Sequence, residues 1–275
     1  MTTVVVKVGG EAIADPVVRA SVAADLAKLQ DQGVALVVIH GGGQQATALA
    51  ERLGVERRVV AGRRITDDAT LEVMKMAVAG IAGTDLATAL DAAGARALPT
   101  TGVAGLIRAT KRPPRVVAGG GEEPIDFGHV GDVIDVDAVR LGFLAGAGLI
   151  PVIGCLASDE AGRVYNINAD IIATRVAHAL AAPLILLTGA PGVLADLDDP
   201  TSRFDRLTPS EFQARIDDGT IRGGMLPKLE ESFRVLSEGA VPVILILPAD
   251  QPGAIASALA SPGAIGTALL PERAP

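Results

Sequence analysis

Short runs of aliphatic and β-branched residues recur along the chain, and they are almost wholly apolar instead of alternating with polar residues. The clearest runs are Val4–Val8, Val34–Ile39, Ile150–Leu156, Leu184–Thr188 and Val241–Leu247. Strands buried on both faces of a parallel sheet have this composition, because helices cover both faces. The pattern therefore constrains the chain to an α/β fold.

Helical stretches lie between these runs. The expected helices are Pro16–Gln32, Gln44–Leu53, Thr70–Ala93, Asp137–Ala147, Asn168–Leu180 and Leu226–Glu238. Asp15 before Pro16 is a typical helix start, and Thr208 with Glu211 predicts a capping box at a further helix. This alternation predicts a three-layer α/β/α sandwich around a mainly parallel central sheet.

Two further features concern the organisation of the chain. The segment Gly105–Val133 is rich in Gly and Pro, and it predicts β-hairpins that project from the sandwich over a substrate site. A strand-rich pattern restarts at Pro183. We therefore expect an N-terminal lobe at residues 1–180, which binds substrate and dimerises, and a C-terminal lobe at 181–275 for a nucleotide.

Composition excludes several classes of function. The 275 residues carry a formal net charge of −8 and include no Trp and one Tyr, which argues against a nucleic-acid-binding protein. The single cysteine, Cys155, permits neither a disulfide framework nor a thiolate metal site, and its apolar surroundings favour a buried strand residue over a nucleophile. The N-terminus has no basic leader and the apolar runs are short for a membrane helix, so we expect a cytoplasmic protein without membrane contact.

Two successive strands end in glycines and lead into helices. Gly9 and Gly10 follow Lys7, and Gly41, Gly42 and Gly43 follow His40. At the carboxyl ends of parallel strands, glycines let backbone N–H groups approach an anion at a helix N-terminus. Two such loops next to Lys7 favour a phosphate site over turns that are merely geometric.

Among the known nucleotide-binding motifs, one offers an alternative to this phosphate site. No Walker-type P-loop occurs, but the segment Gly41–Ala46 fits the relaxed dinucleotide pattern G-x-G-x-x-[GA]. An NAD(P) oxidoreductase therefore stays open as an alternative. Against it, the segment expected to supply an acidic ribose ligand carries arginines instead, Arg57, Arg58, Arg63 and Arg64.

Two later segments carry charges near helix starts. Asn166, Asn168 and Asp170 alternate on the approach to a helix, so a strand-like backbone would point all three the same way, whereas the alternative is an N-cap. Lys228 lies in the first turn of a helix after Gly223 and Gly224, where the helix dipole disfavours a cation unless an anion is shared.

Taken together, these segments resemble the amino acid kinase family along essentially the whole chain. The motifs occur in the family's order and spacing: Lys7-x-Gly-Gly, His40-Gly-Gly-Gly, Gly62-Arg-Arg64-Ile-Thr, Leu71-Glu-Val-Met74, Gly128-His-Val-Gly131, Asn166-Ile-Asn-Ala-Asp170, Leu186-Leu-Thr, Pro191-Gly192 and Gly223-Gly-Met-Leu-Pro-Lys228. Within the family, the chain looks like the members that phosphorylate the side-chain carboxylate of N-acetyl-L-glutamate with MgATP for arginine synthesis.

The resemblance implies a role for each matching residue. Lys7 and Lys228 stabilise the transferring phosphoryl group and Asp170 orients both lysines. Arg64 and Asn166 hold the acetylated amino acid, with Gly42 and Gly43 also near it. Phosphate lies along Gly9, Gly10, Gly42 and Gly43. The remaining nucleotide contacts are expected at Gly189, Gly192, Leu194, Gly223 and Met225. Magnesium is held by ATP oxygens and water, with no protein ligand.

Three departures from the family pattern leave alternatives open. Gly189 stands where relatives usually carry Asp, the segment Leu98–Gly105 differs from the usual substrate loop, and an Asn-Lys pair is replaced near Gly83–Asp85. A kinase of another carboxylate, such as carrier-bound aminoadipate, and a non-catalytic sensor with this fold are the alternatives.

The resemblance also bears on assembly. Arginine-inhibited hexameric members carry a helix ahead of the first strand, whereas Val4 opens the strand here almost at once. We expect an arginine-insensitive homodimer paired through the helix Thr70–Ala93.

Overall fold

The computed structural model describes the chain except for residues 1, 61, 118–119, 223–224 and 273–275. Its strands are β1 (Thr3–Val8), β2 (Ala35–His40), β3 (Val59–Val60), β4 (Arg63–Arg64), β5 (Ala97–Thr101), β6 (Ile107–Lys111), β7 (Gly131–Val136), β8 (Ile150–Gly154), β9 (Leu156–Ser158), β10 (Val164–Asn166), β11 (Leu184–Thr188), β12 (Arg206–Leu207), β13 (Ile244–Pro248) and β14 (Thr267–Leu269).

The helices fall largely where the sequence predicts them. They are α1 (Gly10–Ala14), α2 (Pro16–Asp31), α3 (Gly43–Leu53), α4 (Asp68–Lys75), a π-helical segment η1 (Met76–Ala82), α5 (Gly83–Ala92), α6 (Ala138–Gly146), α7 (Ala169–Ala179), α8 (Pro209–Asp217), α9 (Leu226–Ser237) and α10 (Ala254–Ala260), with short 3₁₀ turns η2 (Gly102–Ala104) and η3 (Pro200–Ser202). The Asp15 cap of α2 and the Thr208–Glu211 capping box of α8 are both confirmed.

An eight-stranded sheet forms the centre of the molecule, in the order β12-β14-β13-β11-β1-β2-β8-β5. Every neighbouring pair is parallel except β13 with β14. The carboxyl ends of β1, β2 and β11 therefore meet at one edge, which is where ligands bind in open α/β sheets.

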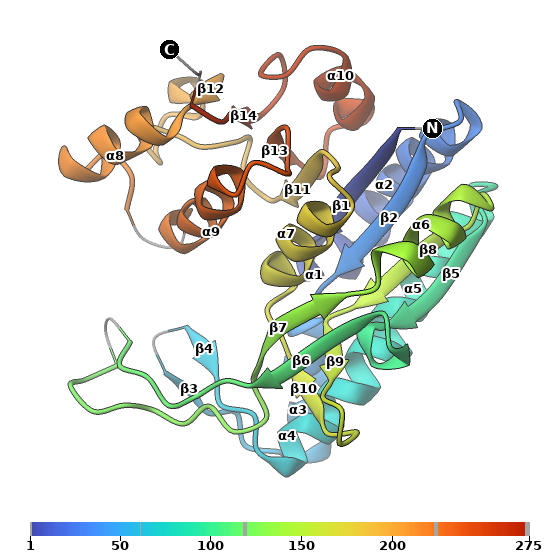
Figure 1. Cartoon of the computed structure of the whole chain (residues 1–275), viewed down its shortest axis with the longest axis vertical. Helices are drawn as coiled ribbons and strands as arrows, with labels where there is room; N and C mark the ends of the chain where they lie inside the picture. Colours follow the sequence, from blue (N-terminus) through green and yellow to red (C-terminus); the bar gives the residue numbers. More distant parts are fainter. Residues whose placement is uncertain (1, 61, 118–119, 223–224, 273–275) are drawn as a thin grey trace.

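Side chains of the central strands pack into two cores on opposite faces of this sheet. Val4 and Val6 of β1 join one core with residues of α2, α5 and α10, whereas Val5 joins the other with residues of α3, α7 and α9. In Figure 1, α7 lies in front of the sheet and α2 and α5 lie behind it. The predicted three-layer sandwich is therefore confirmed.

Two predicted elements differ in detail. The run Ile150–Leu156 is broken at Cys155, because β8 ends at Gly154 and β9 leaves the central sheet to pair with β10. The long helix predicted from Thr70 starts at Asp68, where Asp67 caps it, and widens into the π-helical segment η1 in its middle. Hydrogen bonds that close a wider turn give a local bulge, which period-3.6 patterns do not reveal.

The same helical stretch, Asp68–Ala92, is long and apolar enough to cross a membrane by composition, with a mean hydropathy of 1.3. Half of it is buried inside the protein, as in a core helix.

A second, four-stranded sheet, β10-β9-β6-β7, carries the predicted hairpin. Strands β6 and β7 pair antiparallel, and the chain between them extends away from the sandwich beside the β3–β4 hairpin (Figure 1). Thr66 joins the two, since its carbonyl oxygen accepts a hydrogen bond from the His129 N–H at 2.7 Å. Both hairpins are thereby placed over the carboxyl edge of the central sheet.

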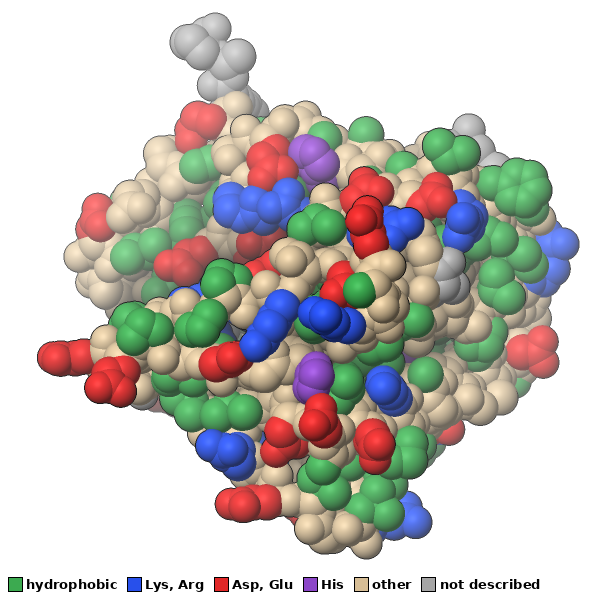
Figure 2. All heavy atoms as spheres, turned by 60° about the horizontal axis from the view of Figure 1, so that its bottom comes forward, with side chains coloured by type: hydrophobic (Ala, Val, Ile, Leu, Met, Phe, Trp, Pro, Cys, Tyr) green, Lys and Arg blue, Asp and Glu red, His purple; other side chains and the backbone are tan. Residues whose placement is uncertain are grey.

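The central sheet runs across residue 180, because β11 pairs with β1. The division into lobes at this residue stays a prediction. On the face shown in Figure 2, acidic and basic side chains are interspersed, with apolar side chains between them.

Candidate active site

Three charged side chains from separate elements meet at the carboxyl edge of the central sheet. Lys7 lies on β1, Asp170 in the first turn of α7, and Lys228 in the first turn of α9. The Nζ of Lys7 is 3.0 Å from Oδ1 of Asp170, and the Nζ of Lys228 donates to Oδ2 at 2.6 Å. One carboxylate thus holds two ammonium groups close together, with both pointing to the same region.

Burial and charge act in opposite directions on these groups. Burial alone would raise the pKa of Asp170, but the ammonium groups of Lys7 and Lys228 hold it below its ordinary value. Burial lowers the pKa of Lys228, and Lys7 adds to that effect, while Asp170 opposes it. The site therefore keeps an ionised carboxylate between two cations that repel each other, an arrangement suited to anionic ligands.

The two glycine loops lie against each other beside this cluster. A Cβ built on Gly10 would lie 3.5 Å from the backbone N of Gly43, and the Gln45 side-chain amide donates to the Gly10 carbonyl at 3.2 Å. Neither α1 nor α3 is capped by a side chain. The backbone N–H groups at both helix starts are therefore available to an anion, as the phosphate prediction requires.

A cavity of about 910 Å³ opens between these loops and the C-terminal strands. Its lining includes Lys7, Gly9, Gly10, Gly43, Arg64, Gly189 and Lys228, all of them predicted site residues. Leu187, Thr188, Ala249 and Asp250 line it from the ends of β11 and β13.

A second cavity of about 530 Å³ lies on the other side of the charged cluster. Asn166 and Asp170 line it, and Arg64 and Lys228 line both cavities. The Asn166 side-chain amide donates to Oγ1 of Thr66 at 3.2 Å, which holds it at the wall. The lysine cluster therefore stands at the junction of two spaces, each large enough for a small molecule.

Arg64 is held in place between them. Its Nη2 donates to Oγ1 of Thr47 at 2.8 Å and to the Gly43 carbonyl at 3.3 Å. Its Nη1 is buried without a hydrogen-bond partner among the residues that the structure describes. Burial and the charge of Arg57 both lower the pKa of Arg64. An unpaired buried guanidinium nitrogen is costly, and a bound carboxylate would satisfy it.

Other predicted residues lie outside both cavities. Gly42 is buried against η1. A Cβ at this position would lie 3.0 Å from Cγ2 of Val78, so glycine allows the close approach of η1. Gly192 has a φ of 147° and faces Thr267, whose Oγ1 a Cβ would meet at 2.7 Å. Leu194 forms an isolated antiparallel β-bridge with Arg203. Met225 is partly buried and packs against the hydrophobic core. Gly223 lies outside the described residues.

Asn168 is also structural. It is the N-cap of α7, and its side chain accepts a hydrogen bond from the Asp170 N–H at 2.8 Å. The N-cap alternative is therefore confirmed for Asn168, whose side-chain oxygen turns back to the helix start.

Several residues near the site escape sequence reasoning. Thr47 lies one helical turn after Gly43 on α3, and this spacing alone could have placed its side chain beside the glycine loop. Glu11 faces Gly189, and a Cβ on that glycine would lie 3.3 Å from Oε2 of Glu11. Arg112 and Arg115 join the second cavity from the hairpin, and only tertiary structure brings them there.

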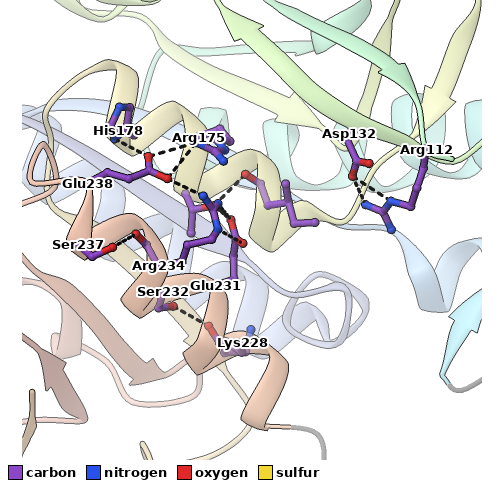
Figure 3. Close-up of polar contacts among 12 residues, drawn as sticks. Arg112, Asp132, Arg175, His178, Lys228, Glu231, Ser232, Arg234, Ser237 and Glu238 are labelled. Atoms are coloured by element: carbon purple, nitrogen blue, oxygen red, sulfur yellow. Dashed lines mark hydrogen bonds and ion pairs between the residues drawn. The ribbon is translucent and has the colours of Figure 1, made fainter. Parts of the chain in front are cut away.

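A network of polar contacts ties α7 to α9 behind the cluster (Figure 3). Glu231 accepts from Thr174 at 2.9 Å and pairs with Arg234, and Glu238 pairs with Arg175 and His178 at 3.2 Å each. Asp170 and Lys228 lie in the first turns of these same helices. The network therefore fixes the distance between the two helices that carry the charged pair.

Comparison with known proteins shows the family of the chain. The sequence matches the amino acid kinase family over residues 2–246. An acetylglutamate kinase from Anaeromyxobacter dehalogenans (strain 2CP-1) is 49% identical over 99% of this chain and 100% of its own length. One from Sorangium cellulosum (strain So ce56) is 50% identical over 97% of this chain and 94% of its own.

Solved structures show the same fold. N-acetylglutamate synthase from Neisseria gonorrhoeae, complexed with coenzyme A and N-acetyl-glutamate, has a TM-score of 0.82 at 25% identity over 99% of this chain and 60% of that one. Carbamate kinase from Giardia lamblia bound to AMP-PNP has a TM-score of 0.71 at 17% identity over 98% and 99%. On its match to the family model and to these relatives, the chain belongs to the amino acid kinase family.

Proposed function

We propose that the chain is an acetylglutamate kinase, which transfers the γ-phosphoryl group of ATP to the side-chain carboxylate of N-acetyl-L-glutamate. The observation that carries this proposal is the Lys7–Asp170–Lys228 cluster at the junction of the two cavities. Relatives with that printed name match the whole chain at about half identity. The larger cavity would take the nucleotide and the smaller one the acetylated amino acid.

The reaction needs charge neutralisation more than proton transfer. The acceptor carboxylate is already ionised near neutral pH, so its oxygen forms the new P–O bond while the bond to the β-phosphate oxygen breaks and ADP leaves. No proton moves in this step. Two anions must therefore be aligned against their mutual repulsion. Lys7 supplies positive charge to the larger cavity, and Lys228 supplies it to both cavities.

The remaining roles follow from position. Backbone N–H groups at Gly9, Gly10 and Gly43 would hold phosphate oxygens, since these glycines line the larger cavity. Arg64 and Asn166 would hold the α-carboxylate of the acetylated amino acid, with the unpaired Nη1 of Arg64 as a donor. Mg²⁺ bound to ATP would neutralise further phosphate charge, and we assign it no protein ligand.

Trapping the product tests the proposal. Hydroxylamine converts an acyl phosphate to a hydroxamate, which we expect with ATP and N-acetyl-L-glutamate. Free glutamate, other acetylated amino acids and aminoadipate derivatives complete the panel. Hydroxamate from another acceptor alone would reassign the substrate, and none at all would favour a sensor. ATP should bind and NADPH should not, so binding of NADPH alone would favour the oxidoreductase alternative.

A further inference from the structure

The smaller cavity carries more positive charge than a small anionic substrate needs. Besides Arg64 and Lys228, four arginines from three separate segments line it: Arg63, Arg112, Arg115 and Arg234. Figure 3 shows Arg112 beside Asp132 and Arg234 among the acidic side chains of α9, on separate segments of the chain. The lining carboxylates are Asp170, Glu230 and Glu231, and Asp170 is already shared by two lysines.

Two of these arginines have a structural partner. Arg112 is buried and donates through Nε to Oδ1 of Asp132 at 2.9 Å. Arg234 donates to Glu231 and Glu238 in the network between α7 and α9. Their charges are therefore largely compensated within the fold.

Arg63 and Arg115 differ from them. Within the described part of the chain, neither forms a salt bridge or a side-chain hydrogen bond. Burial lowers the pKa of Arg115, and the charges of Arg112 and Arg63 lower it further against the weaker pull of Asp132. These guanidinium groups are thus close enough to repel one another. Arg63 is half-buried and Arg115 is exposed, and both line the smaller cavity, so their unpaired charges act on whatever ligand enters it.

The position of the cluster relates it to one atom of the acyl substrate. If Arg64 and Asn166 hold the α-carboxylate, the α-nitrogen on the neighbouring carbon must lie within a few bonds of the same wall. A free amino acid would place an ammonium cation there, whereas an acylated one places a neutral amide. Phe127 and Val130 give this cavity an apolar surface suited to a small acyl group.

We propose that Arg63 and Arg115 select N-acylated over free amino acid by repelling the α-ammonium group, a role that rests on the proposed function. Selection of this kind works by destabilising the wrong ligand. It leaves the reacting carboxylate and the lysine cluster untouched, so both arginines act on specificity and not on the chemical step.

The test compares two ligands that differ only in the substituent on the α-carbon. L-Glutamate and L-2-hydroxyglutarate have the same two carboxylates, but one carries an ammonium and the other a neutral hydroxyl. Both are measured as competitive inhibitors of N-acetyl-L-glutamate phosphorylation, and the ratio of their inhibition constants is the readout. In the native enzyme we expect hydroxyglutarate to bind more tightly. In the double variant Arg63→Gln, Arg115→Gln, the inhibition constant of glutamate divided by that of hydroxyglutarate should fall about tenfold, because the repulsion of the ammonium group is lost.

Arg108→Gln is the matched control, since Arg108 is exposed on β6 and lines neither cavity. Its ratio should stay at the native value. Added salt should narrow the native ratio without any mutation, because it screens the charges. A ratio that the double variant leaves at the native value would overturn the inference, whatever the effect of salt, because Arg64 and Lys228 also carry charge in this cavity. Absence of any acyl phosphate with native enzyme would instead overturn the proposed function.

Discussion

Asp170 and Lys228 occupy equivalent places in two different helices, the first turns of α7 and α9, and their side chains meet at 2.6 Å. A cation near a helix N-terminus is unfavourable, whereas a carboxylate there is favourable. Asp170 therefore offsets the cost of Lys228 and leaves the ammonium group available to the larger cavity.

Replacing either lysine should reduce turnover far more than binding. Lys7→Ala and Lys228→Ala should each lower kcat by about 10²–10³-fold, because their charges matter most as the phosphoryl group moves. Steady-state kinetics with both substrates measures this. Lys28→Ala, on the exposed face of α2, is the control. Near-native kcat in either active-site variant would remove that lysine from the proposed mechanism.

Arg64→Ala should act on the acyl substrate. Loss of its charge-assisted hydrogen bonds should raise the KM for N-acetyl-L-glutamate about 10–100-fold and leave the KM for ATP nearly unchanged. Arg64→Lys should not restore binding, because lysine lacks the planar fork that reaches Thr47 and a carboxylate together. An equal rise in both KM values would contradict this placement.

Gly189 and Glu11 should be coupled in nucleotide binding. Gly189→Asp would place a second carboxylate close to Glu11, so we expect weaker ATP binding by about tenfold through like-charge repulsion. Glu11→Gln in the same chain should recover most of the loss, and Gly189→Asn is the uncharged control. Titration of ATP in the native protein, the two single variants Gly189→Asp and Glu11→Gln, the double variant and the Gly189→Asn control measures the coupling. Additive effects of the two substitutions would show that these side chains do not interact.

Cys155 should be unreactive in the folded protein. Burial raises the pKa of its thiol from 9.0 to about 11. Because the pKa is higher in the folded state than in the unfolded state, ionisation of Cys155 does not affect the free energy of unfolding below about pH 9. Above that pH the unfolded state ionises first, so the free energy of unfolding falls as the pH rises toward 11. A thiol reagent at pH 8 should label the chain only under unfolding conditions, with Cys155→Ala as the blank. Rapid labelling of native protein would contradict the burial.

The π-helical segment η1 should form part of a dimer interface. Met76 and Ile81 are 46% and 36% exposed on it, although they lie on a helix that is otherwise half buried. Light scattering should give a dimer, and Ile81→Glu should shift it toward monomer by burying an unpaired charge. Val17→Glu, at an exposed position of α2, should not. A native monomer or hexamer would contradict the prediction.

Local signals in the sequence determined most elements and part of the site. The Asp15 and Thr208 caps act within a few residues, so the starts of α2 and α8 could be predicted from the chain alone. Apolar runs long enough to be buried on both faces likewise identified β1, β2 and β11. Lys7 and Lys228 stood out because glycines and helix starts lie next to them in sequence.

Contacts between distant segments decided the rest. The carboxylate of Asp170 meets Lys228 across a separation of 58 residues, and Glu11 reaches Gly189 only because β1 and β11 are neighbours in the sheet. Asn168 and Asp170 look alike in sequence, but one caps its helix and the other binds lysines. Arg63 and Arg115 share a cavity because two hairpins fold over the same edge. The sequence gives the charge of each side chain. The electrostatic energy of that charge depends on its neighbours and its burial, and only the tertiary structure determines both.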